Sequence, residues 1–181
     1  MTDSALSGTW DIDPTHTRIG FAARHAMVTK VRGAFNEVSG TLVLDVEDPS
    51  ASSATLTVQM ASIDTRTPQR DEHLRSADFF DVGTYPEMTF VAGRIEEVDE
   101  GSWIVDGALT IRDVTRDLAV PLRLVGIEND PFGAVRAGLE GSRRIDRRDW
   151  GISWNTPLDS GGLLVSESIQ LEFELSLVKR A

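Results

Sequence analysis

The sequence predicts an all-β protein: an antiparallel barrel of about eight strands with one short helical insertion near the barrel mouth. Segments in which apolar and polar side chains alternate recur along the chain, which is the pattern of strands that bury one face. Short turn sequences such as Glu47–Ser50 join them, and short connections make neighbouring strands antiparallel. Long one-sided strands must cover their edges, and closure into a barrel does so completely.

The strand segments follow one another with a single interruption. One short and eight long segments are expected, at Thr9–Asp13, Thr17–Val28, Ala34–Glu47, Ala54–Ile63, Glu87–Val98, Trp103–Arg112, Leu118–Ile127, Ala134–Ile145 and Ser166–Val178. The last is the most regular, because Ile169, Leu171 and Phe173 alternate with polar residues. The same alternation in the second segment puts His25 on the inward face with Ile19.

The interruption is the stretch Thr67–Phe80, which predicts the helix. A Thr–Pro pair opens it, with Thr67 as the cap and proline at the first helical position. Asp71 and Arg75 are spaced as an exposed i, i+4 ion pair. Such a short helix needs packing to hold it, and Phe79 and Phe80 are the expected anchors. We expect the helix to lie across one end of the barrel.

The length and composition of the chain exclude several classes of function. The chain has 181 residues, which suits one domain spanning residues 1–181. Its net charge of −11 argues against nucleic acid as a partner and against electrostatic docking on anionic lipid headgroups. The absence of cysteine excludes thiol chemistry and disulfides. The sequence carries neither a secretory signal nor an apolar run of the roughly 18 residues of a transmembrane segment, so a cytoplasmic location is expected.

The inward faces predict either a solid core or an apolar cavity. They carry aliphatic and aromatic residues almost throughout, with small residues such as Ala92 and Gly107 that leave room. A cavity of this kind suits an aliphatic or isoprenoid molecule. Two alternatives stay open: an enzyme with His25 or His73 as acid or base, and a metal protein that uses His16, His25 and His73. No two of these histidines have the usual ligand spacing.

Several motifs, in order along nearly the whole chain, resemble the YceI-like family. They are WDIDPTH at residues 10–16, the Phe21–His25–Met27 set, Gly33–Phe35, RDEHL at 70–74, DFFD at 78–81, YPEMTF at 85–90, GALTIR at 107–112 and IDRRDWGI at 145–152. Thr17 stands where the family usually has serine, and Asp113 where it usually has glycine. Neither change is expected to alter the interior.

The resemblance implies a lipocalin-like barrel that binds an isoprenoid-type lipid, a polyprenyl lipid or isoprenoid quinone, for sequestration or transport, with no catalytic residue and no other cofactor. Many relatives are periplasmic. A third alternative function is a stress-response structural module with a solid core. The polar candidates for the mouth are His16, His25, Arg70, Asp71 and His73, and those for the apolar wall or lid are Phe21, Leu74, Phe79, Phe80, Phe90 and Trp103. Outward apolar residues such as Val43, Val91 and Val125 permit a homodimer.

Overall fold

The computed structural model describes residues 4–181, and strands dominate it. The strands are β1 (Gly8–Ile12), β2 (Arg18–His25), β3 (Thr29–Phe35), β4 (Val38–Leu44), β5 (Ser53–Gln59), β6 (Ile63–Asp64), β7 (Glu87–Asp99), β8 (Ser102–Ile111), β9 (Val114–Asn129), β10 (Val135–Asp146) and β11 (Ser168–Lys179). The α-helix is α1 (Pro68–Arg75), and short 3₁₀ turns are η1 (Ser4–Leu6), η2 (Pro49–Ala51), η3 (Met60–Ser62) and η4 (Arg147–Trp150).

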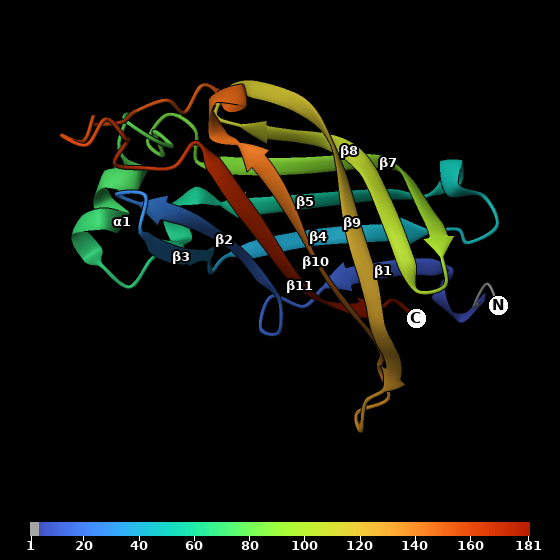
Figure 1. The fold of residues 1–181 in the computed structure, drawn as a ribbon. Helices are drawn as coiled ribbons and strands as arrows, with labels where there is room; N and C mark the ends of the chain where they lie inside the picture. Colours follow the sequence, from blue (N-terminus) through green and yellow to red (C-terminus); the bar gives the residue numbers. More distant parts are fainter. Residues whose placement is uncertain (1–3) are drawn as a thin grey trace.

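Eight of these strands close an antiparallel barrel (Figure 1). The order is β1-β4-β5-β7-β8-β9-β10-β11, and β11 pairs back with β1. The expected all-β barrel with one short helix is therefore confirmed. Figure 1 shows α1 at one end of the barrel, with the N-terminus and the β7–β8 turn at the other.

The remaining strands extend the sheet beyond the barrel at the helix end. One edge of β11 pairs with β1 at Leu177–Lys179 and with β2 at Gln170–Glu174. The sheet then continues from β2 to β3 and on to the two-residue β6. The expected strand Ala34–Glu47 instead holds the end of β3 and all of β4, because β3 pairs with β2 in the extension while β4 pairs with β1 in the barrel wall.

The helix is shorter than the sequence predicts. It ends at Arg75, because Ser76 is extended and both its N–H and its hydroxyl bond the His73 carbonyl. Residues up to Phe80 form turns instead, and the Phe80 N–H bonds the Leu74 carbonyl at 3.0 Å. Thr67 is at the cap position, but its side chain makes no capping hydrogen bond.

The expected exposed pair between Asp71 and Arg75 is wrong. Asp71 is buried and its carboxylate accepts from the Thr65 N–H at 2.8 Å. Arg75 donates to the carbonyls of Ala61 and Ile63 at 3.0 and 3.1 Å. Both side chains therefore fasten α1 to the preceding chain rather than to each other. No helix in the described part of the chain is long and apolar enough to span a bilayer.

The inward position expected for His25 is also wrong. Where β2 lines the barrel, Ile19 is buried at 4% exposure, and the next residue, Gly20, is buried as well. The last residues of the strand project past the barrel as part of the β2–β3 hairpin, so His25 is exposed. The strand pattern cannot show where a strand leaves the barrel.

Candidate functional site

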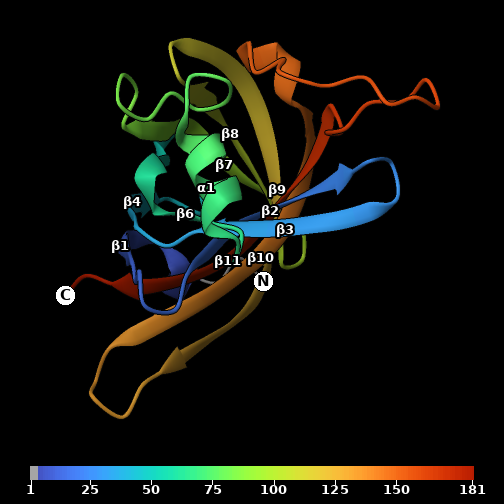
Figure 2. The same ribbon diagram turned by 90° about the vertical axis from the view of Figure 1, so that its left-hand side faces the viewer.

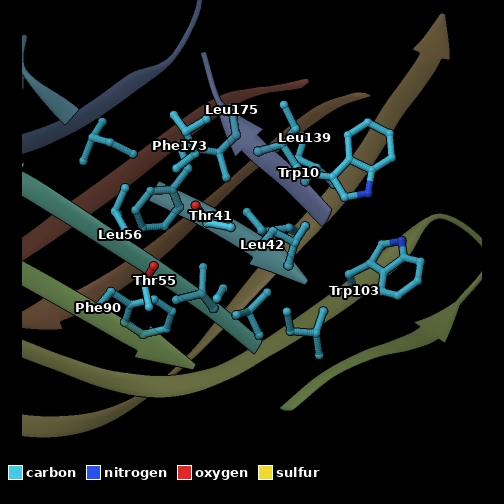
Figure 3. A pocket seen from close by; sticks show the side chains of 18 of the residues that line it. Trp10, Thr41, Leu42, Thr55, Leu56, Phe90, Trp103, Leu139, Phe173 and Leu175 are labelled. Atoms are coloured by element: carbon cyan, nitrogen blue, oxygen red, sulfur yellow. The ribbon is translucent and has the colours of Figure 1, made fainter. Parts of the chain in front are cut away.

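An apolar cavity of about 160 Å³ lies inside the barrel. Its lining comes from nearly every barrel strand, and Figure 3 shows side chains that face it, among them Trp10, Leu42, Leu56, Leu139, Phe173 and Leu175. None of the described residues that line it has an acidic or basic side chain. The cavity therefore rewards burial of apolar surface and offers no ion pair to a ligand.

Alternation along the strands produces this lining. On β9 the even-numbered residues Leu118, Leu122 and Leu124 line the cavity, and on β11 the odd-numbered Leu171 and Leu177 do so. Their neighbours in sequence point outward, as the two-residue period of a strand requires. These inward stripes follow from the sequence pattern.

The cavity is narrow because aromatic rings fill part of the barrel. Phe90 lies against Gly107, where a Cβ atom would come within 2.6 Å of the Phe90 ring. Gly107 thus leaves space for a ring of the protein rather than an empty volume. Ligand pockets usually measure roughly 300–1,000 Å³, so a long chain needs side chains such as Phe90 to rotate as it enters.

One polar atom stands out on the wall, the indole nitrogen of Trp103. The side chain is 5% exposed, and its Nε1–H has no hydrogen-bond partner among residues 4–181. Trp10 is nearby in Figure 3, but its Nε1 donates to the Leu6 carbonyl at 2.8 Å. Buried donors are usually paired, so the Trp103 indole is an exception in the described chain.

The barrel wall separates between β9 and β10. Their pairing stops at Arg123–Glu140, while β9 continues along β8 through Pro121 and β10 continues along β11. Proline has no N–H to donate, which suits it to such an unpaired edge. The inward positions here are arginines: Arg116 continues the Leu118 stripe of β9, and Arg143 continues the Leu139 stripe of β10.

A second, polar cavity of about 610 Å³ occupies this opening. Arg116, Arg143 and Arg144 line it together with Asp117, Asp146 and Asp149. Asp146 Oδ2 forms an ion pair with Arg148 Nη2 at 2.7 Å. Arg143, in contrast, has no ion pair within the described residues. Leu118 lines both cavities, so one leucine separates the polar opening from the apolar interior.

At the helix end, Thr65 gathers two of the predicted polar residues. Its N–H and hydroxyl both donate to Asp71 Oδ1, and its hydroxyl and carbonyl accept from Arg70, each at 2.7 Å. Arg70 and Asp71 thus hold the chain between β6 and α1. Neither residue lines the barrel cavity.

The third predicted polar residue of this region, His73, lies in an aromatic cluster. Its Nε2 is 2.8 Å from the Asp78 carboxylate, and its ring packs edge-on against Phe79 and Trp154 at 5.1 and 4.7 Å. Arg147 lies above Phe79 at 6.0 Å. The cluster covers the helix end of the barrel beside the core.

Arg147 is buried, although it lies in the charged run of residues 143–149. It is 5% exposed and donates to the carbonyls of Ile152 and Ser166 at 2.8 and 2.9 Å. Burial lowers the pKa of its guanidinium. Nothing in the charged run around it distinguishes the buried arginine from its exposed neighbours in the sequence.

The other predicted site residues are spread over the molecule. Phe90 and Trp103 line the cavity. The ring centroids of Phe21 and Phe80 lie 5.7 and 6.1 Å from the ring centroid of Phe35. Leu74 of α1 packs against the core. His16 is exposed in the β1–β2 loop. Within residues 4–181, no acidic or histidine cluster suited to a metal ion is present.

His16 belongs to a separate network around Asp13. That carboxylate accepts from the Thr15 hydroxyl at 2.6 Å, from Arg136 at 2.7 Å and from His16 at 2.8 Å. These hydrogen bonds, the one from Thr15 foremost, hold the pKa of Asp13 well below its usual range. The DPTH motif therefore forms a structural junction between the β1–β2 loop and β10.

Comparisons with known proteins agree with this architecture. UPF0312 proteins of Shewanella baltica and Shewanella oneidensis are each 34% identical over 152 residues, which cover 84% of this chain and 80% of theirs. The crystal structure of Burkholderia cenocepacia BcnA superposes with a TM-score of 0.79 at 23% identity, over 91% of this chain and 98% of that one. A Campylobacter jejuni YceI protein gives 0.71 at 27% identity, over 87% and 90%.

A further solved structure is described as a polyisoprenoid binding domain from Saccharophagus degradans implicated in plant cell wall breakdown. It has a TM-score of 0.72 at 16% identity and covers 94% of this chain and 98% of that one. The profile of the YceI-like domain matches residues 10–177. With a closed barrel, an apolar interior and this match over nearly its whole length, the chain belongs to the YceI-like family.

Proposed function

We propose that this protein binds an isoprenoid-type lipid in its barrel and sequesters or carries it, without catalysing a reaction. The observation that supports this is the cavity, which is enclosed by eight strands and lined by apolar residues without an acid or base. The S. degradans domain of the same fold, described as polyisoprenoid binding, supports the choice of ligand class. A branched, flexible hydrocarbon chain suits a narrow interior that adapts by rotation of aromatic rings.

Extraction of the purified protein with organic solvent, followed by mass spectrometry, tests this directly. We expect a hydrophobic molecule with an isoprenoid chain, or uptake of added polyprenol or isoprenoid quinone by the delipidated protein. A protein that carries no such molecule and takes up neither lipid would contradict the proposal.

A pair of variants on one strand locates the ligand. Leu175 lines the cavity, and Glu174 is its exposed neighbour on β11. Leu175→Trp fills the narrow interior and should lower lipid uptake at least tenfold, whereas Glu174→Trp should leave it unchanged. Thermal unfolding of both variants separates loss of binding from loss of fold. Equal uptake by the two variants would place the lipid outside the barrel.

The polar head of the lipid has two candidate positions. The sequence predicts the helix end, near Arg70 and His73, but Thr65 and Asp78 already engage these side chains. We place the head in the opening between β9 and β10, because Leu118 borders both this opening and the apolar interior. Arg143 is at an inward position there and lines the opening.

Two arginine variants test this second step. We expect Arg143→Ala to weaken the binding of a lipid with a polar head several-fold, and Arg94→Ala, at an exposed position of β7 outside the opening, to leave it unchanged. A weakening by Arg70→Ala, with Arg143→Ala unaffected, would return the head to the helix end. Uptake of the hydrocarbon squalene, which has no head, serves as the control for the integrity of the cavity.

A further inference from the structure

The β2–β3 hairpin differs in charge from the rest of this acidic chain. Residues 14–36 contain four of its 18 basic residues, Arg18, Arg24, Lys30 and Arg32, and none of its 29 acidic ones. Arg18 bonds Glu172 at 3.5 Å, but the other three have no ion pair among the described residues. A local basic surface is thus present on a protein whose net charge is −11.

These three cations share one face of the hairpin. Arg24 is directly opposite Lys30 in the strand pairing, and Arg32 is two residues further along the same face of β3. Like charges directly opposite each other destabilise a strand pair. All three side chains are exposed, so the hairpin accepts this repulsion without a neutralising partner.

The tip of the hairpin is apolar and strained. Met27 and Val28 are 61% and 77% exposed. Ala26 and Met27 turn the chain with φ angles of 51° and 66°, which cost non-glycine residues roughly 1–2 kcal/mol each. An Asn–Gly pair is the usual choice for such a two-residue turn. The sequence instead keeps a large apolar side chain at the point of the hairpin.

A neighbouring loop fixes the tip in place. The Ala26 N–H donates to the Leu164 carbonyl at 2.7 Å, and the Arg24 N–H donates to the Ser166 hydroxyl at 2.8 Å. Figure 2 shows the hairpin and the loop that contains residues 155–165 projecting on the same side of the molecule. In that loop Asp159 is the one acidic residue. The apolar tip is therefore presented outward on a supported hairpin.

We propose that the β2–β3 hairpin docks on an anionic lipid bilayer, with Met27 and Val28 in the interfacial layer and Arg24, Lys30 and Arg32 against the headgroup phosphates. An apolar tip with adjacent cations matches such a surface in both polarity and charge. The acidic remainder of the chain does not prevent this, because salt screens charges beyond roughly 8 Å at physiological ionic strength. Docking places a lipid-binding barrel beside the membrane that holds lipid.

Co-sedimentation with vesicles tests the proposal on the full chain. We expect binding to phosphatidylcholine vesicles that contain phosphatidylglycerol, weaker binding to phosphatidylcholine alone, and release at high salt. Lys30→Gln/Arg32→Gln should reduce binding by about 30-fold, since each cation near an anionic surface contributes about fivefold. Arg94→Gln/Arg123→Gln, with the same change in net charge on exposed strand positions, should have little effect.

A second variant keeps the hairpin folded while removing its apolar tip. Ala26→Asn/Met27→Gly/Val28→Ser gives the turn its preferred residues, so the protein should be at least as stable, yet vesicle binding should fall by about tenfold. Phe132→Ser is the control, because Phe132 is 94% exposed at the tip of another hairpin. Unchanged binding by the tip variant, or equal loss with Phe132→Ser, would overturn the proposal.

The outcome is separable from the proposed lipid cargo. Vesicle binding needs no occupied cavity, and uptake of lipid from detergent micelles needs no docking, so either result stands if the other fails. Hairpin-dependent binding to a soluble polyanion such as double-stranded DNA, without binding to vesicles, would assign the hairpin to a different partner and overturn the membrane proposal.

Discussion

Asp13 and Arg136 are joined by a 2.7 Å hydrogen bond between Oδ2 and Nη1, although 123 residues separate them. Arg136 also donates to Asp130 at 2.8 Å. The pair ties the loop after β1 to the turn end of the β9–β10 hairpin. Charge-assisted hydrogen bonds of this kind are stronger than neutral ones.

Replacement of Asp13 tests this junction. The hydrogen bonds lower the pKa of Asp13, so its stabilising contribution is present above the ordinary carboxyl pKa of about 4 and declines below it. Asp13→Asn should lower the free energy of unfolding by roughly 1–3 kcal/mol at neutral pH, with a smaller difference in acid. Urea unfolding at several pH values measures this. Asp159→Asn, on an exposed loop, should change little, and a difference that grows in acid would contradict the assignment.

Asp71 is the anchor of α1. Asp71→Ala leaves the buried N–H and hydroxyl of Thr65 without their acceptor, which should cost about 2–3 kcal/mol. Hydrogen exchange of the segment from Thr65 to Arg75 should accelerate. Glu72→Ala removes an exposed carboxylate from the same helix and should not alter exchange. If both variants exchange alike, Asp71 does not hold the helix.

Arg147 stabilises the barrel end from within. Arg147→Met preserves much of the packing volume but removes the donors to the Ile152 and Ser166 carbonyls. We expect a loss of about 3 kcal/mol, which thermal and denaturant unfolding will show. Arg144→Met, three positions earlier and exposed, should stay within about 0.5 kcal/mol. A similar effect of both changes would argue that charge, rather than burial, matters here.

Gly141 lies close to Pro121 of β9, just beyond the last paired residues Arg123 and Glu140. A Cβ atom at this position would lie 2.2 Å from the Pro121 carbonyl oxygen, and a backbone atom cannot easily move away. Gly141→Ala should therefore push the strands apart and destabilise the protein by about 2 kcal/mol. Gly93→Ala is the matched control on β7, because nothing lies within 4 Å of its Cβ position. A neutral Gly141→Ala would show that the opening between these strands is already loose.

Part of the candidate site follows from the strand pattern of the sequence, and part depends on the tertiary structure. Of the wall residues that the resemblance implies, Phe90 and Trp103 line the cavity, and each is at a position of its strand whose side chain faces inward. Phe173 also lines the cavity, and it belongs to the alternating apolar residues of the last strand, but it was not selected as a site residue. For His25 the same rule failed, because β2 continues beyond the barrel and both faces of its end meet solvent.

The sequence by itself determined the all-β class, the inward stripes and the place of the helix, since these depend on local periodicity and on turn residues. Tertiary structure decided the rest. Closure through β1 and β11, the end of the β9–β10 pairing at Arg123 and Glu140, and the burial of Asp71 and Arg147 depend on the tertiary structure. A carboxylate six residues from its partner threonine, or one arginine among several, has no local pattern that marks it as buried.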